Sequence, residues 1–195
     1  AVFSTQPFCL ASQKNPIVSE PKALSIAGLY SLKKGTVNVR IKNAVVIYKE
    51  QDSAVIKQEG GRAFYIYKAA KELQYAMTYN LTITHLNRHY GNLEVTGIKD
   101  VNLLDRKTDM EAYFIDGPSH DFEDLQLRNE VIGQISGVFE NGWLHYDGER
   151  KVRLYFSIPA LKPEDFSMIT ISHVRIGFHR HPEIIVENED QVRKQ

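Results

Sequence analysis

The sequence predicts an all-β chain, with short helices, that forms two tandem five-stranded Greek-key barrels. Three observations predict this fold class. A strand–turn–strand pattern occurs twice, a second hairpin precedes each copy, and the composition is that of a globular protein, with 43% hydrophobic and 25% charged residues. The 195 residues are enough for two small domains.

The repeat is clearest in the later hairpin of each half. Residues 79–95 and 168–186 each contain a strand, a polar turn and a second strand. Both contain a Thr-Ile-(Thr/Ser)-His core, at 82–85 and at 170–173, followed by a basic turn with histidine and glycine. Such self-similarity indicates that the two halves share one fold.

Further elements match upstream of these hairpins. Each half has an earlier hairpin with an acidic, glycine-containing turn, a long alternating first strand, and a helix-like stretch before it. Ser25 is a candidate N-cap for the first of these stretches. The expected elements are helices at 25–32 and 120–127, long strands at 37–48 and 131–139, and hairpins at 55–67 and 143–155.

A crossover separates the two hairpins of each half. Residues 69–76 have room for one helical turn, and Pro159 and Pro163 limit helix in residues 158–165 to a short piece. Five strands with a crossover between the third and fourth are typical of a partly open barrel of OB (oligonucleotide/oligosaccharide-binding) type. One continuous β-sandwich of about ten strands is the competing interpretation. The repeat favours two barrels.

Domain limits follow from this division. We expect a polar tail over 1–23, a basic first barrel over 24–107 and an acidic second barrel over 112–190. Cys9, the only cysteine, excludes an internal disulfide, and the residues before it lack the small, apolar character of a lipid-anchor site. No apolar run approaches the ~18–20 residues of a membrane span, so no transmembrane segment is predicted. No secretory signal is recognised at the start of the chain.

Alternation predicts which faces of the strands are buried. Val39 and Ile41 are expected inside the first barrel and Arg40 outside, with a bulge or bend near Asn43-Ala44, where the pattern changes phase. On the third strand of each half the outward residues are expected to be aromatic or basic. They are Tyr65 and Tyr67 in the first half, and Lys151, Arg153 and Tyr155 in the second.

The opening helix, the first long strand and the hairpin after Tyr79 resemble the OB-fold nucleic-acid-binding superfamily. They are most similar to tandem OB modules of uncharacterised bacterial secreted proteins and lipoproteins. The resemblance covers residues 24–104, and it extends to 120–188 through the repeat. It implies a ligand across the outer face of the second and third strands, between two flanking loops. These regions contain Tyr48, Lys49, Lys57, Arg62, Tyr65, Tyr67, Lys68, Arg88, His89 and Tyr90.

These residue types suit single-stranded nucleic acid, because aromatic rings stack on bases and basic groups follow phosphates. For Tyr65 and Tyr67, an interface between the two domains is an equally good interpretation. Glu50 and Asp52, in the first flanking loop, would repel a phosphate backbone.

Charge is divided between the halves, although the whole chain has no net charge. Residues 24–107 hold 13 Lys and Arg against 7 Asp and Glu, which gives +6. Residues 110–195 hold 9 Lys and Arg against 15 Asp and Glu, which gives a net charge of −6. Either the basic barrel binds a polyanion while the acidic one contacts a protein partner, or the two barrels attract each other. Solvated faces that happen to differ are a third interpretation.

No catalytic residue, metal site or cofactor is predicted. His179 and His181 lie two apart and share one side of a strand, with His173 and Glu183 nearby, but a third ligand at convincing spacing is missing. No hydrolase or phosphate-cradle motif occurs. Trp143 could stack on a base or a sugar, but a lone Trp at the start of a strand is more often a core residue, and the core is the interpretation favoured here.

The sequence therefore predicts a non-enzymatic binding protein whose first barrel contacts single-stranded nucleic acid or another polyanion. The second barrel is expected to act as a support or docking partner. The alternative is an extracytoplasmic module that binds protein or glycan and has no nucleic-acid role. An extracytoplasmic or lipid-anchored location is favoured over the cytoplasm.

Overall fold

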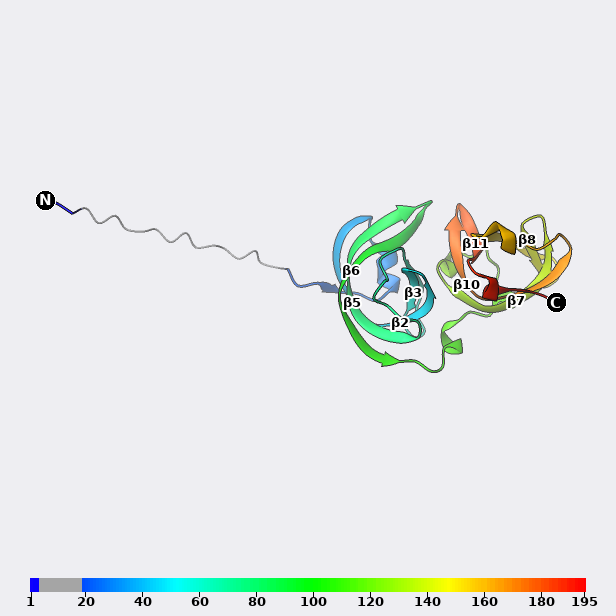
Figure 1. Ribbon diagram of the computed structural model, residues 1–195, viewed down its shortest axis with the longest axis horizontal. Coiled ribbons are helices and arrows are strands. Elements are labelled where there is room, and N and C mark those ends of the chain that lie inside the picture. Colours follow the sequence, from blue (N-terminus) through cyan, green and yellow to red (C-terminus); the bar gives the residue numbers. More distant parts are fainter. Residues whose placement is uncertain (4–18) are drawn as a thin grey trace.

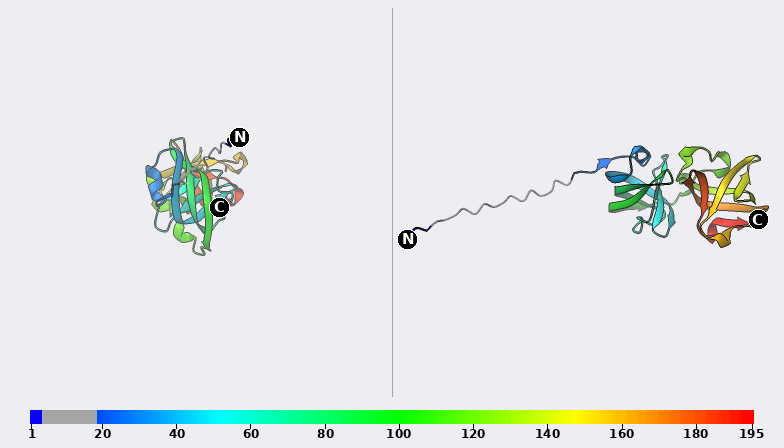
Figure 2. Two further views of the ribbon diagram at one scale, coloured as in Figure 1. Left: turned by 90° about the vertical axis from the view of Figure 1, so that its left-hand side faces the viewer. Right: turned by 90° about the horizontal axis from the view of Figure 1, so that it is seen from above.

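Two closed five-stranded barrels lie side by side in the computed structural model (Figure 1), which describes residues 1–3 and 19–195. A view from above shows the same arrangement (Figure 2). Cys9 and most of the expected tail lie outside the described residues. Among the residues that are described, no helix is long and apolar enough to cross a membrane.

The first barrel has the strand order of an OB fold. Its strands pair in the order β2-β3-β4-β6-β5, and β5 pairs back to β2 and closes the barrel. β4 and β6 are parallel and the other neighbours antiparallel. The elements are β1 (Lys22–Ala23), the 3-10 helix η1 (Ala27–Ser31), β2 (Gly35–Glu50), β3 (Ser53–Lys57), β4 (Ala63–Ile66), β5 (Met77–His89) and β6 (Asn92–Arg106).

The second barrel repeats this topology, in the order β7-β8-β9-β11-β10, again closed by an antiparallel pair and with one parallel pair, β9 and β11. The predicted pair of barrels is thus confirmed, and the single sandwich is wrong. The strands are β7 (Val131–Glu140), β8 (Trp143–Tyr146), β9 (Arg150–Phe156), β10 (Ser167–His179), β11 (His181–Val186) and β12 (Val192–Lys194). The 3-10 helices are η2 (Glu111–Tyr113), η3 (Gly117–Ser119), η4 (Leu125–Leu127), η5 (Pro159–Leu161) and η6 (Glu189–Gln191).

Some predicted details differ from the structure. The first crossover contains turns and no helix, whereas the second contains η5 at the expected place. The expected helix over 120–127 is reduced to η4. β1 and β12 pair with barrel strands although they lie outside the expected limits of 24–107 and 112–190, which themselves remain a prediction.

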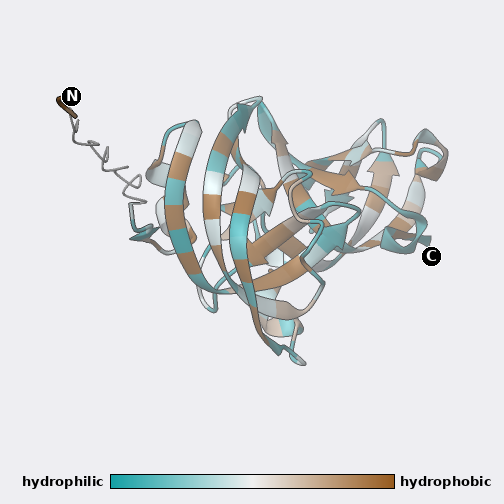
Figure 3. Ribbon diagram, turned by 60° about the vertical axis from the view of Figure 1, so that its left-hand side comes forward, coloured by the Kyte–Doolittle hydropathy of each residue, from teal (hydrophilic) through white to brown (hydrophobic). Residues whose placement is uncertain are grey.

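The alternation of the first strand is confirmed, and so is its bulge. Val39 and Ile41 lie in the core of the first barrel, and hydropathy alternates in bands along the strands (Figure 3). The pairing register shifts between Ile41 and Ala44, and Asn43 has a φ of 55°. Beyond this bulge β2 is apolar on both faces. Its outward residues there are Val45 and Ile47, which face the second barrel.

An apolar cluster joins the barrels. It combines outward residues of β2, β3 and β4 with residues of the linker and of β7. Burial of these apolar side chains stabilises the association of the two barrels. The buried members are Val45, Ile47, Tyr48, Val55, Ala63, Tyr65, Tyr113 and Val131.

A buried ion pair crosses the same interface. Lys57 Nζ lies 2.8 Å from Glu130 Oε2, and both side chains are buried. Lys57 Nζ also donates to the Tyr113 carbonyl (3.2 Å), and Glu130 Oε1 accepts from the backbone N–H of Ala63 (3.1 Å). A basic residue of the first barrel therefore neutralises an acidic residue of the second. This pair supports the interpretation that part of the opposite charge serves assembly.

Candidate functional site

A cleft of about 780 Å³ lies between the two barrels. On the first barrel its walls come from β4 and from the β5–β6 hairpin. On the second they come from β8, from β9 and from the β10–β11 hairpin. In both barrels these are the outer face of the third strand and the loop between the fourth and fifth strands, which the resemblance implies as ligand surfaces.

Aromatic rings from both barrels line this cleft. Tyr67 and Tyr90 of the first barrel are 41% and 56% exposed, and Tyr155 of the second is 54% exposed. Trp143 also lines the cleft and is half-buried, so the expectation that it belongs to the core is wrong. It starts β8 on the outer side of the barrel. Tyr65 lies beneath these rings and is buried.

Cations of the second barrel hold positions next to these rings. Lys151 Nζ lies 4.5 Å from the centroid of the Trp143 ring, and Arg153 Cζ lies 5.3 Å from it. Arg175 Cζ lies 4.1 Å from the centroid of the Tyr65 ring. These distances are within the ~6 Å range of cation–π attraction. The second barrel, although acidic overall, therefore presents basic groups to the cleft.

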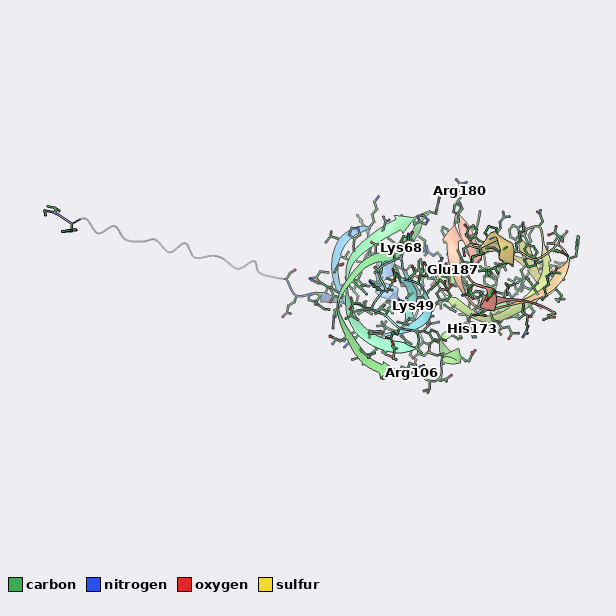
Figure 4. The ribbon with its side chains drawn as sticks, in the orientation of Figure 1. Lys49, Lys68, Arg106, His173, Arg180 and Glu187 are labelled. Atoms are coloured by element: carbon green, nitrogen blue, oxygen red, sulfur yellow. The ribbon has the colours of Figure 1, made fainter. Side chains whose placement is uncertain are left out.

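Arg175 is fixed from the side opposite to Tyr65. Its Nη2 lies 3.0 Å from Glu187 Oε1, and the hydroxyl of Tyr48 donates to the other oxygen of this carboxylate. Burial and the neighbouring Glu187 raise the pKa of Tyr48, so its hydroxyl keeps its proton. Figure 4 places Glu187 on the side of the second barrel that faces the first.

The tips of two hairpins meet at one end of the cleft. The rings of Tyr90 and His179 have centroids 4.0 Å apart. Gly91, with a φ of 89°, lies so close that an added Cβ would be 3.3 Å from the Phe178 ring. A larger residue would strain both the turn and this packing. Arg180 projects from the tip of the β10–β11 hairpin (Figure 4).

Carboxylates also line the cleft. Glu94 is only 7% exposed, Glu183 is half-buried and Glu123 is exposed. Burial raises the pKa of both Glu94 and Glu183, because desolvation disfavours the charged form. Nearby Arg175 and the cleft histidines oppose this effect in part. The cleft therefore contains hydrogen-bond acceptors as well as cations.

Four of the ten predicted ligand residues line the cleft, namely Tyr65, Tyr67, His89 and Tyr90. Tyr48 and Lys57 instead belong to the interface between the barrels, and the rest are not in the cleft lining. Two of these cations donate to backbone carbonyls, Lys49 Nζ to that of Ala70 and Arg88 to that of Gly91 (3.0 Å). The other two lie near aromatic rings. Arg62 Cζ is 3.5 Å from the centroid of the Tyr30 ring, and Lys68 Nζ is 5.1 Å from the centroid of the Tyr67 ring. Lys49 and Lys68 are labelled in Figure 4.

Sequence reasoning missed the contribution of the second barrel. The outward positions of Lys151, Arg153 and Tyr155 follow from alternation, and these residues are indeed exposed while Val152 and Leu154 are buried. Carrying the expected ligand face from the first copy of the repeat to the second would have found all three.

The histidines considered for a metal site are separated. His173 Nε2 lies 3.5 Å from Glu111 Oε1, and its ring faces Phe114 and does not line the cleft. His179 and His181 line the cleft. Within the described residues, no group of three or more His, Cys, Asp or Glu side chains is arranged to hold a metal ion.

Comparisons with known proteins identify no relative by sequence, since no protein-family model and no curated protein match the chain. Solved structures resemble it weakly. The tetrameric p202 HIN2 has a TM-score of 0.39 at 10% identity, covering 84% of this chain and 96% of its own. A murine DNA-binding protein bound with double-stranded DNA has a TM-score of 0.37 at 14% sequence identity, and the match covers 81% of this chain and 94% of that protein's chain. Fission yeast Pot1 with single-stranded DNA has a TM-score of 0.37 at 9% sequence identity, and the match covers 85% of each chain.

At these scores the likeness carries no argument about function. The assignment of two OB-type barrels rests on strand order and pairing. The resemblance to secreted bacterial modules and lipoproteins remains a prediction.

Proposed function

We propose that this chain is a non-enzymatic protein that binds single-stranded nucleic acid, or another polyanion, in the cleft between its barrels. One observation carries the proposal. Exposed rings from both barrels and the exposed cations Lys151 and Arg153 line the same cleft. Proteins that bind single strands combine such stacking rings with basic groups that follow the backbone.

The dimensions of the cleft support a short bound segment. Its volume of about 780 Å³ lies in the usual range of ligand pockets. The formal charges of its lining balance, with Lys151, Arg153 and Arg175 against Glu94, Glu123 and Glu183. Affinity should therefore come from stacking and from a few placed phosphate interactions, and should be moderate rather than tight.

The test is binding of a fluorescently labelled mixed-sequence DNA strand, followed by anisotropy over a range of salt concentrations. Affinity should fall linearly on a log–log plot against salt. Replacing Lys151 and Arg153 together by Gln should weaken binding and reduce the slope by about 0.7 for each phosphate that the variant no longer neutralises. Lys33 and Lys34, two exposed residues outside the cleft lining, provide the matched control as a double Gln variant. Absence of binding at low salt contradicts the proposal.

A glycan ligand is the second candidate, and one observation favours it. Trp143 lies in the same cleft as the carboxylates of Glu94 and Glu183, and pockets that combine an aromatic surface with a few polar groups suit sugars as well as bases. Binding of a neutral oligosaccharide, unaffected by salt and abolished in Trp143→Ala, would support this candidate. A protein partner on the acidic second barrel remains a prediction.

A further inference from the structure

We infer that a bound single strand continues out of the cleft onto a patch of four arginines, which hold its phosphates beside the tips of the β5–β6 and β10–β11 hairpins. This inference rests on the proposed function and extends its ligand surface. The arginine patch consists of Arg62 and Arg88 from the first barrel and Arg128 and Arg180 from the second. None of the four belongs to the lining of the cleft.

The ring of Tyr30 brings two of these arginines together. Arg62 Cζ lies 3.5 Å from the centroid of this ring, and Arg128 Cζ lies 5.4 Å from it. Both distances are within the ~6 Å range of cation–π attraction. The two guanidinium groups come from different barrels and repel each other, so an anion bound beside them would relieve this repulsion.

The other two arginines come from the hairpin tips. Arg88 Nη1 donates to the Gly91 carbonyl over 3.0 Å, and Gly91 packs against the ring of Phe178. The centroid of this ring lies 5.9 Å from Arg128 Cζ. Arg180 projects from the tip of the β10–β11 hairpin (Figure 4). Because Phe178 also lines the cleft, the arginine patch adjoins the cleft at this end.

No carboxylate neutralises the arginine patch. Among the described residues, none of its members has an Asp or Glu oxygen within 4.0 Å. The acids nearest to Arg128 in the sequence are engaged elsewhere, since Glu130 is paired with Lys57 and Asp124 accepts from the backbone N–H of Gln126. Uncompensated positive charge at the end of a cleft attracts a polyanion and draws it along the surface.

Three of the arginines are placed to contact phosphate directly. Arg88 and Arg180 are exposed, and Arg128 is half-buried. Arg88 donates one hydrogen bond, through Nη1, and Arg128 one, from Nε to the Leu125 carbonyl. Their remaining N–H groups suit phosphate oxygens, because a guanidinium presents its donors as a planar fork. Nε and Nη2 of Arg62 are buried, so Arg62 contributes charge rather than a contact.

The experiment compares two labelled single strands with the full chain, one of about four and one of about twelve nucleotides, both within the range of OB site sizes. The short strand occupies the cleft, whereas the long strand also reaches the arginine patch. Arg88→Gln combined with Arg128→Gln should weaken binding of the long strand about tenfold. It should lower the salt slope of that strand by about 1.4, since about 0.7 is lost with each phosphate. Binding of the short strand should stay nearly unchanged.

Two further variants make this result specific. Arg88→Lys combined with Arg128→Lys keeps both charges and should keep the salt slope. Lys99→Gln combined with Arg106→Gln removes two exposed charges from the part of β6 beyond the hairpin, and should leave both strands unaffected. Figure 4 places Arg106 at the end of the first barrel opposite to Arg180. If thermal unfolding shows that the double Gln variant is less stable, Arg180→Gln at an exposed tip repeats the test with a slope change of about 0.7.

The strand lengths separate this inference from the proposed function. Weakening that is confined to the long strand, and absent from the Lys99 and Arg106 control, supports the inference. An unchanged salt slope for the long strand overturns it and leaves the proposed function standing, and so does equal weakening of both strands. Failure of both lengths to bind overturns the proposed function, and the inference with it.

Discussion

The outer faces of the third strands differ between the two barrels, although both strands alternate in the same way. On β4, Tyr65 points outward and is buried against the second barrel. On β9, Lys151, Arg153 and Tyr155 point outward and remain exposed. The two copies share a topology but use this face differently, one for assembly and one toward the cleft.

This difference shows that a repeated fold does not imply a repeated site. Apolar and ion-paired residues on β2, β3 and β4 let the second barrel cover much of the ligand face expected on the first. The corresponding face of the second barrel carries charged residues and is left open. We therefore assign the larger share of the proposed ligand surface to the second barrel, with Tyr67, His89 and Tyr90 completing it from the first.

The largest expected effect comes from breaking the buried ion pair. Lys57→Met leaves the Glu130 carboxylate buried without its cation, and should lower the free energy of unfolding by about 3–5 kcal/mol. Chemical denaturation measures this decrease. Lys57→Met combined with Glu130→Gln removes both charges, keeps an acceptor for the Ala63 N–H, and should recover part of the stability.

The exposed pair of Glu111 and His173 is the control for this experiment, and Glu111→Gln should change stability by less than about 0.5 kcal/mol. If Lys57→Met lowers the free energy of unfolding by less than about 1 kcal/mol, the interface between the barrels does not depend on this ion pair.

A smaller effect is expected from the rings that face the cleft. Tyr155→Ala and Tyr67→Ala should each weaken binding of a single strand by about 1–3 kcal/mol, if each ring stacks one base. Both residues are exposed, so thermal unfolding should stay nearly unchanged. Tyr75→Ala is the matched control, because Tyr75 is equally exposed but does not line the cleft. Equal weakening in all three variants would remove the distinction between cleft and surface tyrosines.

The smallest effect concerns pH. Burial raises the pKa of Glu183 above its ordinary value of 4.5, so the folded state binds this proton more readily than the unfolded state. The buried charged carboxylate therefore lowers the free energy of unfolding at neutral pH. This loss of stability disappears as pH falls through the raised pKa of Glu183 to below 4.5. Glu183→Gln should therefore stabilise the chain slightly at neutral pH and not at pH 4. Denaturation at both values checks this, and an equal effect at both would exclude titration of Glu183 as the cause.

Local patterns make the fold predictable. The division into two barrels follows from the repeat, the buried positions from alternation, and the bulge from the change of phase at Asn43-Ala44. The apolar run over residues 44–48 already indicates a strand buried on both faces, but only the tertiary structure shows that the second barrel covers it.

The candidate site is less predictable because its parts are distant in the sequence. Lys57 and Tyr48 have the chemistry of ligand-binding residues, yet their partners are Glu130 and Glu187, 73 and 139 positions away. A pattern of residue types cannot distinguish a cation that is free to bind phosphate from one already paired across an interface. Trp143 is a different case, since the predicted hairpin over 143–155 already pairs it with Arg153 and the outward side of this strand pair could have been assigned to it.

The apolar face of β2 beyond its bulge has a consequence for synthesis of the protein. The first barrel, which ends with β6, is synthesised before the second barrel is complete, so Val45 and Ile47 have no surface to cover them until β7 and the rest of that barrel are in place. An uncovered apolar patch on a nascent chain favours aggregation and chaperone binding. We therefore expect the partly synthesised chain to aggregate more readily than the complete one.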